Sequence, residues 1–388
     1  MINILYLHAG SEMYGADKVL LELVTGLDKK KFHPIVILPS EGVLAVALRH
    51  SKIEVYIVSY PILRRKYFNL RGIVSYTYGY FKATKQIFHI IKNQQINLIH
   101  VNTIAVLEGI LLKHKLKVPL IWHIHEIITT PKVVYKVTSF LLGKYADQVI
   151  AVSGAVKEHL VSSGKINQEK IKIIYNGVDN NVFNPNVTTG YLFDEFNIPH
   201  DSLRVGMIGR VNAWKGQTDF LQATAPLLEK YPKLYLILVG GVFAGEEQRM
   251  IKLRQIAAQL PNNNRIIISD FRNDTANLHN FFDVFVLPST RPDPLPTVVL
   301  EAMASGKPVI GYRHGGICEM VIEGYNGLLV SPNKSELLQN AVEQVVTSKE
   351  LRKVMGNNSL QRQDNYFSLS AYISNFSQLY SLLTKIKS

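Results

Sequence analysis

Residues 283–312 read DVFVLPSTRPDPLPTVVLEAMASGKPVIGY. The apolar run at 283–288 predicts a buried strand that ends in a proline-rich loop. A helix is expected to follow from about Thr297, and a second apolar run at 308–312 predicts the next strand. A helix between two such strands joins them in parallel. This stretch therefore predicts an α/β fold, in which helices cover both faces of a parallel sheet.

The same alternation of apolar runs and helical segments continues outward through both halves of the chain. The strand candidates are 2–7, 33–38, 53–58, 96–101, 118–124, 148–152 and 171–175 in the first half, and 203–209, 234–240, 265–269, 283–288, 308–312 and 327–330 in the second. A chain of 388 residues is too long for one ordinary core and fits two such domains. The intervening segment is rich in Asn, Pro and Gly, which is typical of a linker. We predict a boundary near residues 177–200 between Rossmann-like domains at 1–180 and 190–368.

Both halves begin with a strand that turns through glycines into a helix. The two turns read HAGSEMYGADK (8–18) and GRVNAWKGQ (209–217). Such turns let backbone N–H groups approach a phosphate, and the helix dipole favours its negative charge. Neither turn contains G-x-G-x-x-G, so the sequence gives little support to a nicotinamide dehydrogenase. Two phosphate-binding edges around one linker indicate a ligand held between the domains.

Composition restricts the compartment and the class of protein. Hydrophobic residues make up 47% of the chain and charged residues 19%, as in a globular protein. The single cysteine, Cys318, excludes an internal disulfide and fits a reducing cytosol. No apolar run is long enough to span a bilayer, and the first residues, MINILYL, resemble a strand rather than a signal peptide. We expect a cytoplasmic protein.

Positive charge is concentrated in the first half of the chain. Residues 1–180 contain 23 Lys and Arg against 12 Asp and Glu, whereas the net charge of the whole chain is +13. A one-sided basic field favours an anionic partner. No nucleic-acid-binding motif is present, so we expect no nucleic acid partner. Residues 62–92 mix Arg and Lys with Tyr, Phe and Ile, which suits an anionic membrane surface and equally suits a helix with its apolar stripe in the core.

Five segments resemble a known family. PSTRPDPLPTVVLEAMASGKPVI (288–310) is similar to the signature of the retaining glycosyltransferases of family 4, which have the GT-B fold. In that signature two carboxylates stand in a spaced pair before an A-M-A-x-G-x-P-V-I run. GRVNAWKG resembles the G-R-L-x-x-x-K-G element of the family, and YNGVD (175–179), GGICE (315–319) and NGLLV (326–330) match further landmarks in the same order. The resemblance implies two Rossmann-like domains that face each other across a cleft, with a last helix at 369–388 that packs back on the first domain.

The signature segment supplies candidate donor-binding residues. Glu301 is the second carboxylate of the pair, and the resemblance implies that it holds the ribose hydroxyls of a nucleotide. Asp293 stands where the family usually has Glu and would contact the hydroxyls of the donor sugar. The backbone N–H groups of Leu295, Thr297 and Val298 surround the predicted helix start, where they can face a diphosphate.

The other candidates lie outside the signature. The resemblance implies that Arg210 and Lys215 bind the diphosphate and that Gly15 lets the backbone approach the donor. His125, followed by Glu126, resembles the His-Asp pair of the family and would lie near the reacting sugar. His123 and His125 also have a metal-like spacing. No third ligand is evident nearby and the chain contains no D-x-D, so we predict no metal site.

Together these residues predict a metal-independent, retaining hexosyltransferase. It would move a sugar from a UDP- or GDP-linked donor, without a cofactor, to a glycan or lipid-diphosphate-linked acceptor in bacterial cell-surface polysaccharide synthesis. We expect it in the cytoplasm, with peripheral attachment to the inner face of the cell membrane as a further hypothesis. Two alternatives stay open: a UDP-sugar 2-epimerase with the same fold, and a non-catalytic glycosyltransferase-like partner protein, for which Asp293 is the reason.

Overall fold

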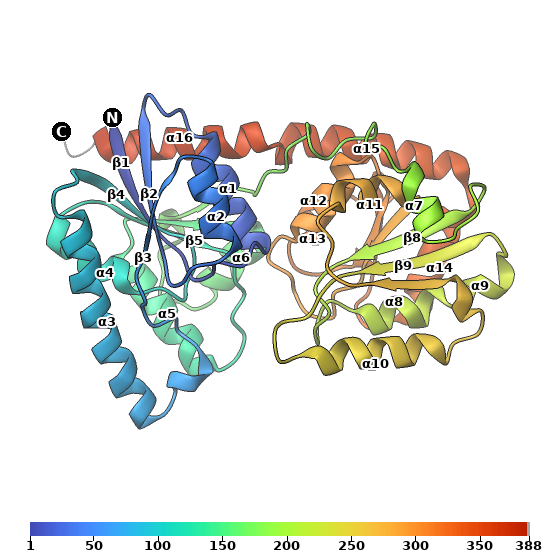
Figure 1. Cartoon of the computed structure of the whole chain (residues 1–388), viewed down its shortest axis with the longest axis horizontal. Helices are drawn as coiled ribbons and strands as arrows, with labels where there is room; N and C mark the ends of the chain where they lie inside the picture. Colours follow the sequence, from blue (N-terminus) through green and yellow to red (C-terminus); the bar gives the residue numbers. More distant parts are fainter. Residues whose placement is uncertain (386–388) are drawn as a thin grey trace. The chain divides into compact units, whose positions relative to one another are not determined.

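Two parallel β-sheets organise the chain in the computed structural model, which describes residues 1–385 except the side chain of Arg65 (Figure 1). Each sheet belongs to its own compact unit. Unit 1 consists of Met1–Asn176 and the segment from Ser370 onward, and unit 2 is Gly177–Leu369. The chain therefore passes from one unit to the other twice. Residues 386–388 of the predicted last helix lie outside the described part.

The sheet of unit 1 has seven strands in the order β3-β2-β1-β4-β5-β6-β7, and all its pairings are parallel. Its strands are rich in Ile, Leu and Val and largely buried, as expected for strands covered by helices on both faces. The α/β prediction is confirmed. The strands are β1 (Ile2–Leu7), β2 (Phe32–Leu38), β3 (Glu54–Ile57), β4 (Ile96–Val101), β5 (Leu120–Ile124), β6 (Gln148–Ala151) and β7 (Ile171–Ile173).

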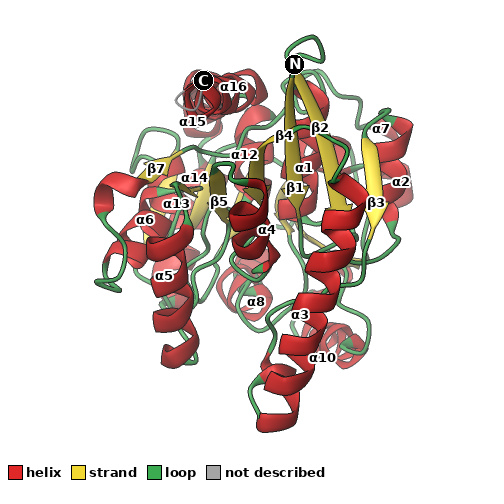
Figure 2. Cartoon of the chain, turned by 90° about the vertical axis from the view of Figure 1, so that its left-hand side faces the viewer, coloured by secondary structure: helices red, strands yellow, loops and turns green. Residues whose placement is uncertain are grey.

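Helices lie on both sides of this sheet (Figure 2). The longest among the described residues, α3, buries one face of its C-terminal half, with Ala83, Ile87 and Ile91, whereas its N-terminal half is largely exposed. The helices of unit 1 are α1 (Gly15–Gly26), α2 (Val43–His50), η1 (Arg65–Tyr67), α3 (Leu70–Ile91), α4 (Glu108–Leu116), α5 (Lys132–Tyr145), α6 (Gly154–Val161), η2 (Gln168–Lys170) and α16 (Leu369–Lys385).

The last helix, α16, packs on unit 1. The hydroxyl of Tyr380 is 3.0 Å from that of Tyr6 in β1 and 2.7 Å from Nδ1 of His100 in β4. Phe376 is fully buried, and the centroid of its ring lies 5.0 Å from that of His123 in β5. One helix at the end of the chain thus covers three neighbouring strands at its beginning.

The sheet of unit 2 has six parallel strands in the order β10-β9-β8-β11-β12-β13. Its strands are β8 (Leu203–Ile208), β9 (Leu234–Val239), β10 (Ile266–Ser269), β11 (Val284–Leu287), β12 (Val309–Tyr312) and β13 (Gly327–Val330). Its helices are α7 (Gly190–Glu195), α8 (Gln217–Thr224), α9 (Leu227–Lys230), α10 (Glu247–Ala258), η3 (Asn263–Arg265), α11 (Thr275–Phe281), α12 (Thr297–Ala304), α13 (Ile317–Met320), α14 (Ser335–Thr347) and α15 (Lys349–Phe367).

The strand order reverses once in each sheet. Successive strands are added on one side of β1 up to β3 and then on its other side from β4, and β8, β9, β10 and β11 repeat this pattern in unit 2. In open α/β sheets, ligands bind outside the carboxyl ends of the strands where the order reverses. The topology therefore directs attention to the residues that follow β1 and β4 in unit 1, and β8 and β11 in unit 2.

Among the described residues, no helix combines the length and the apolar character that crossing a bilayer requires.

Candidate functional site

The turns after β8 and β11 bring two predicted site residues into direct contact. Nζ of Lys215 lies 2.5 Å from Oδ2 of Asp293, and both side chains are largely buried, with 17% and 14% of their surface exposed. The hydroxyl of Ser289 donates a hydrogen bond of 3.1 Å to the same carboxylate oxygen. A cation and an anion thus meet at the point where the strand order of unit 2 reverses.

Local sequence explains how the turn after β8 reaches that position. The side-chain oxygen of Asn212 accepts the backbone N–H groups of Trp214 at 3.0 Å and Lys215 at 2.9 Å, which closes a tight turn. Gly216 follows with a φ of +84°, and a Cβ atom there would stand 1.9 Å from the carbonyl oxygen of Pro288. Only glycine lets this turn lie directly against the turn after β11.

Arg210 also follows β8. Its guanidinium carbon lies 3.5 Å from the centroid of the Phe243 ring, which fixes the side chain through a cation–π contact. Its carbonyl oxygen accepts a hydrogen bond of 2.9 Å from the side chain of Gln217 at the start of α8. Backbone and side chain are both held at the same edge of the sheet as Lys215.

The loop after β11 leads into the N-terminus of α12. Thr297 and Val298 are the first two residues of this helix, and N–H groups in a first turn have no acceptor within their own helix. Leu295 precedes them and is buried. The dipole of α12 adds partial positive charge at this end. The three residues thus lie at the N-terminal end of α12, close to Asp293 in the same loop.

A glycine turn after β12 supports this loop from behind. Gly315 has a φ of +68°, and the N–H of Gly316 donates to the carbonyl oxygen of Asp293 at 2.8 Å. A Cβ atom at Gly316 would stand 2.1 Å from the carbonyl oxygen of Pro294. Glycine at these two positions therefore lets the two loops touch.

Glu301 lies inside unit 2. Its side chain is about 5% exposed, and Oε2 is 3.1 Å from Nε2 of His279 in α11. A buried carboxylate requires such a partner, because desolvation is costly for an unpaired charge. His279 was missed by the sequence analysis, since it stands alone in α11 and belongs to no motif.

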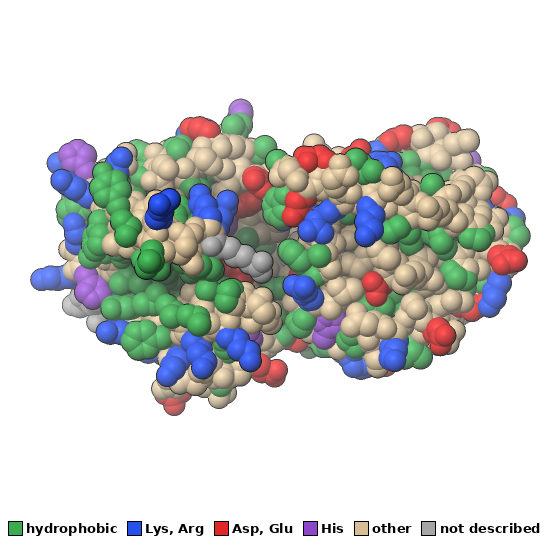
Figure 3. Space-filling model, turned by 90° about the horizontal axis from the view of Figure 1, so that it is seen from below, with side chains coloured by type: hydrophobic (Ala, Val, Ile, Leu, Met, Phe, Trp, Pro, Cys, Tyr) green, Lys and Arg blue, Asp and Glu red, His purple; other side chains and the backbone are tan. Residues whose placement is uncertain are grey.

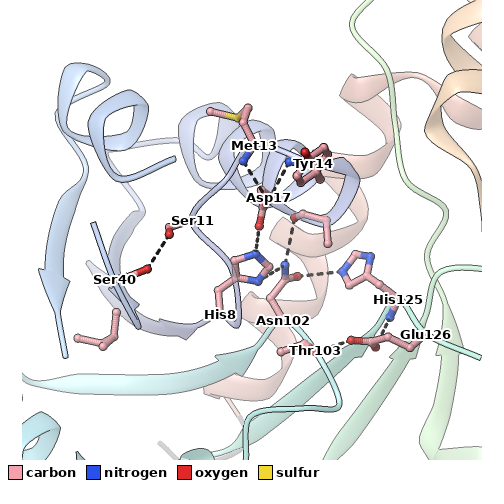
Figure 4. Close-up of polar contacts among 12 residues, drawn as sticks. His8, Ser11, Met13, Tyr14, Asp17, Ser40, Asn102, Thr103, His125 and Glu126 are labelled. Carbon is pink, nitrogen blue, oxygen red and sulfur yellow. Dashed lines mark hydrogen bonds and ion pairs between the residues drawn. The ribbon is translucent and has the colours of Figure 1, made fainter. Parts of the chain in front are cut away.

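The corresponding edge of unit 1 carries a second polar cluster (Figure 4). His8 follows β1, Asn102 follows β4, and His125 follows β5. Nε2 of His125 is 3.0 Å from Oδ1 of Asn102, whose Nδ2 is 3.2 Å from Nδ1 of His8. Nε2 of His8 in turn is 2.5 Å from Oδ1 of Asp17 in α1. The predicted residue Gly15 is the exposed first residue of α1, two positions before Asp17.

Burial controls the charge of this cluster. Desolvation, with a smaller effect of nearby His8, lowers the pKa of His125 to about 3, so its imidazole is neutral at neutral pH. Burial alone would raise the pKa of Asp17. Hydrogen bonds from His8 and from the backbone amides of Tyr14 and Met13 outweigh that effect and lower the pKa. Asp17 is therefore a carboxylate.

Glu126 positions the backbone of its neighbour. Its carboxyl group accepts hydrogen bonds from the hydroxyl of Thr103, from the N–H of Ile104 at 3.4 Å and from the N–H of His125 at 3.0 Å. Burial raises its pKa above the ordinary value. These contacts fix the backbone position of His125. The carboxyl group of Glu126 is engaged by them and is not a second reactive group.

His123 points into the core. It is fully buried between the rings of His100 and Phe376, and burial depresses its pKa well below the ordinary value. Within residues 1–385, no cluster of three or more His, Cys, Asp or Glu side chains is placed to hold a metal ion. His123 lies within β5 and is buried, and His125 directly follows this strand at the sheet edge. Their two-residue spacing is that of alternate positions along an extended chain.

Two family models match the chain. The model described as "Glycosyltransferase Family 4" matches residues 13–182, and the model described as "Glycosyl transferases group 1" matches residues 191–362.

Among solved structures, HepE from Anabaena in complex with UDP is similar to this chain with a TM-score of 0.85 and 24% identity. The match covers 98% of this chain and 100% of that chain. HepE has also been crystallised with UDP-glucose. This likeness confirms the predicted GT-B fold class, with two Rossmann-like domains built on parallel sheets.

Two curated relatives match parts of the chain. The UDP-Gal:alpha-D-GlcNAc-diphosphoundecaprenol alpha-1,3-galactosyltransferase of Escherichia coli is 27% identical over 252 residues, which are 64% of this chain and 64% of the relative. The capsular polysaccharide biosynthesis glycosyltransferase CapM of Staphylococcus aureus is 23% identical over 252 residues, covering 62% and 63%. The chain spans about half to two thirds of the length of the curated relatives it matches. The two family models together account for most of the sequence, and the chain therefore belongs to the group 1, or family 4, glycosyltransferases.

Proposed function

We propose that this protein transfers a sugar from a nucleoside diphosphate to an acceptor hydroxyl, with the donor held at the edge of unit 2. The observation that carries the proposal is the contact between Lys215 and Asp293 beside the N-terminus of α12. The site joins a cation and helix amides for a diphosphate to a carboxylate for sugar hydroxyls.

Each part of the donor has a partner in this arrangement. Arg210 and Lys215 would face the diphosphate together with the N–H groups of Leu295, Thr297 and Val298. Asp293 would accept hydroxyls of the sugar, and Glu301 would accept hydroxyls of the ribose. We propose a UDP-linked hexose as the first donor to test, because HepE has been crystallised with UDP-glucose and the E. coli relative is named for UDP-Gal. GDP-linked sugars come second.

The reaction breaks the bond between the anomeric carbon and the diphosphate oxygen and forms a bond from that carbon to the acceptor oxygen. Negative charge grows on the leaving phosphate as the sugar becomes oxocarbenium-like. Lys215, Arg210 and the helix amides would stabilise that charge in place of a metal ion.

We propose that the anomeric configuration is retained. The leaving phosphate takes the proton of the acceptor hydroxyl on the same face of the sugar, so no covalent sugar–enzyme bond forms. The carboxylates of the polar cluster in unit 1 support this route, because Asp17 and Glu126 are each already engaged by several hydrogen bonds.

Donor binding is expected to raise the melting temperature. A ligand present at a hundred times its Kd stabilises the native state by about 2.7 kcal/mol, which is several degrees for a protein of this size. A thermal-shift screen with UDP-, GDP- and ADP-sugars should identify one class of nucleotide. The Glu301→Gln variant should lose most of the shift, because an amide accepts ribose hydroxyls less well yet still reaches His279.

Glu301→Ala is a weaker test, since it leaves His279 without this partner and lowers the melting temperature by itself. Glu343→Gln, at a partly exposed carboxylate of the same unit that pairs with Lys230 and accepts the hydroxyl of Tyr231, is the matched control and should keep the full shift. Stabilisation by none of the sugar nucleotides would contradict the proposal.

The two alternatives considered from sequence are not favoured, because both matching family models are glycosyltransferase models. A UDP-sugar 2-epimerase would convert the donor alone, so donor turnover without an acceptor is the measurement that separates it from a transferase.

Unit 1 has a surface feature, on helix α3, that bears on the acceptor. The N-terminal half of α3 exposes large apolar side chains: Leu70 is 84%, Val74 69% and Tyr78 71% exposed. Such residues are normally buried, and a contiguous exposed group of them marks an interaction site. Of the two sequence interpretations, the core-facing stripe applies only to the second half of the helix.

A second helix repeats this composition. On α5 the side chains of Val133, Val137 and Phe140 are exposed alongside Lys132 and Lys136. No Asp or Glu occurs between Glu54 and Glu108, or between Glu126 and Asp147. Figure 3 shows hydrophobic and basic side chains side by side on this face of unit 1.

We propose that this face attaches the protein to the cytoplasmic leaflet of the cell membrane and that the acceptor is a lipid-diphosphate-linked glycan. Apolar side chains would enter the headgroup region while Lys and Arg contact anionic lipids. The E. coli relative is named for an acceptor on a diphosphoundecaprenol lipid, which supports this choice.

Binding to vesicles is expected to require both anionic lipid and the exposed apolar residues. In a flotation assay at low salt, the protein should bind phosphatidylglycerol-containing vesicles at least about tenfold better than pure phosphatidylcholine vesicles. The triple variant Leu70→Ser, Val74→Ser, Tyr78→Ser should lose at least about tenfold in partitioning, since each side chain contributes more than 1 kcal/mol when buried.

A triple variant of exposed apolar residues in unit 2, Ile251→Ser, Leu337→Ser, Val354→Ser, is the control and should bind as the parent does. Equal binding to neutral and anionic vesicles would count against attachment by this face.

A further inference from the structure

Four polar side chains form a continuous hydrogen-bonded chain in unit 1: His125, Asn102, His8 and Asp17 (Figure 4). They come from the ends of β5, β4 and β1 and from the first turn of α1. His8, Asn102 and Asp17 are buried, and His125 is partly exposed at the outer end of the chain. Of these four, the family resemblance places only His125 near the reacting sugar, so the other three need a reason of their own.

The carboxylate of Asp17, at the inner end, determines which atom donates and which accepts at each hydrogen bond of this series. An ionised carboxylate has acceptors and no donor. Oδ2 of Asp17 already accepts the backbone N–H groups of Met13 at 3.0 Å and Tyr14 at 2.8 Å. Oδ1 must then accept from Nε2 of His8, which therefore carries the ring proton. Nδ1 of His8 faces the amide nitrogen of Asn102, which can only donate, so Nδ1 accepts.

The direction passes on to the outer end. Nδ1 of His8 accepts from the amide nitrogen of Asn102, whose second hydrogen faces the carbonyl oxygen of Ala16 at 3.4 Å. That orientation turns Oδ1 of Asn102 toward His125, so Nε2 of His125 must donate. A neutral imidazole has one proton, and its other nitrogen, Nδ1, then accepts.

We propose that Asp17 is a positioning residue that acts through His8 and Asn102 to hold His125 with its proton on Nε2, so that Nδ1 accepts a hydrogen bond from a hydroxyl of the bound substrate. The identity of that substrate as a sugar rests on the proposed function. The fixed tautomer of His125 does not depend on the proposed function. The low pKa of His125 agrees with the arrangement, because the imidazole stays neutral and holds only one ring proton.

An isosteric substitution should reverse the whole chain. In Asp17→Asn the amide oxygen must serve the N–H groups of Met13 and Tyr14, so the amide nitrogen faces His8. Nε2 of His8 then accepts and Nδ1 donates, so Asn102 turns over at the loss of its 3.4 Å contact with the carbonyl oxygen of Ala16, and Nε2 of His125 has to accept. The variant would thus present an N–H instead of a lone pair at Nδ1 of His125, without a change in shape.

Long-range ¹H–¹⁵N spectra of protein labelled at histidine nitrogens report this directly, in the absence of any ligand. His8→Gln and His125→Gln variants assign the two signals among the 12 histidines. In the parent, both residues should show the Nε2–H tautomer, and in Asp17→Asn both should show Nδ1–H. Asp28→Asn, an exposed position beyond the end of α1, is the matched control and should change neither.

A second variant covers the case in which Asp17→Asn does not fold. Asn102→Leu removes the middle of the chain at similar volume, so His8 should keep its Nε2–H tautomer while His125 loses its preference. An Nδ1–H tautomer of His125 in the parent would overturn the proposal. So would an unchanged His125 in folded Asp17→Asn.

An activity measurement separates this proposal from the proposed function. With the donor found by thermal shift, Asp17→Asn should lower kcat about tenfold through one lost hydrogen bond and change KM for the donor little. Expected tautomers in a parent protein that transfers no sugar would support the hydrogen-bonded chain and contradict the transferase. Sugar transfer by the parent, combined with unaltered His125 signals in Asp17→Asn, would support the transferase and contradict the hydrogen-bonded chain.

Discussion

Replacing Lys215 by alanine is expected to lower kcat for sugar transfer by about a hundredfold, or about 3 kcal/mol in barrier height. The ammonium group lies 2.5 Å from Asp293 and stands in the turn that faces the proposed diphosphate. Its loss removes a charge that would stabilise the leaving group. It also leaves the carboxylate of Asp293 without its cation next to an anionic donor. Initial rates at saturating donor and acceptor measure the effect.

Two further variants define what Lys215 does. Lys230→Ala, at an exposed ion pair of the same unit, controls for the loss of a positive charge and should leave kcat unchanged. Asp293→Ala combined with Lys215→Ala tests whether Asp293 only neutralises the lysine. If it did, the double variant would be more active than Lys215→Ala alone. If Asp293 also binds the sugar, the double variant is slower still. An unchanged kcat in Lys215→Ala would remove the lysine from the proposed mechanism.

Replacing Phe376 by alanine is expected to destabilise unit 1 by about 3–5 kcal/mol, the usual cost of truncating a fully buried phenylalanine. Phe376 anchors α16, with its ring centroid 5.4 Å from that of His100 and 5.0 Å from that of His123. Urea unfolding should show a lower midpoint for unit 1 than in the parent.

The two tryptophans of the chain make this measurable for one unit at a time. Trp122 is buried in β5 of unit 1, and Trp214 lies in the turn after β8 of unit 2. In a Trp214→Phe background the fluorescence reports unit 1 alone. Leu382→Ala, at an exposed position of the same helix, should shift the free energy of unfolding by no more than about 0.5 kcal/mol. An unaffected Trp122 transition in Phe376→Ala would mean that α16 contributes little to the core.

The sequence predicted the elements well because their signals are local. The apolar runs at 96–101 and 203–209 become strands almost residue for residue, since period and β-propensity need no knowledge of neighbours. The order of the strands is different. Nothing local shows that β4 pairs with β1, and that pairing is what brings Asn102 beside His8. The polar chain is therefore not visible in the sequence, although each member follows a predicted strand or lies at the start of a predicted helix.

The burial of α3 could not be predicted from the sequence for the same reason. The pattern of residues 62–92 allowed both a core-facing stripe and an exposed one, because amphipathicity does not say where neighbouring elements stop. The structure shows that packing on α3 includes Ile87 and does not reach Leu70 or Val74. His279, the partner of Glu301, was likewise invisible, since a single histidine in α11 carries no pattern.

Unit 1 is built from two separate segments of the chain, and this has a consequence for biosynthesis. A ribosome completes all of Gly177–Leu369 before it produces the helix that covers Tyr6, His100 and His123. Throughout that interval the nascent first unit lacks one wall of its core. Unit 1 therefore cannot complete its core before all of unit 2 has been synthesised.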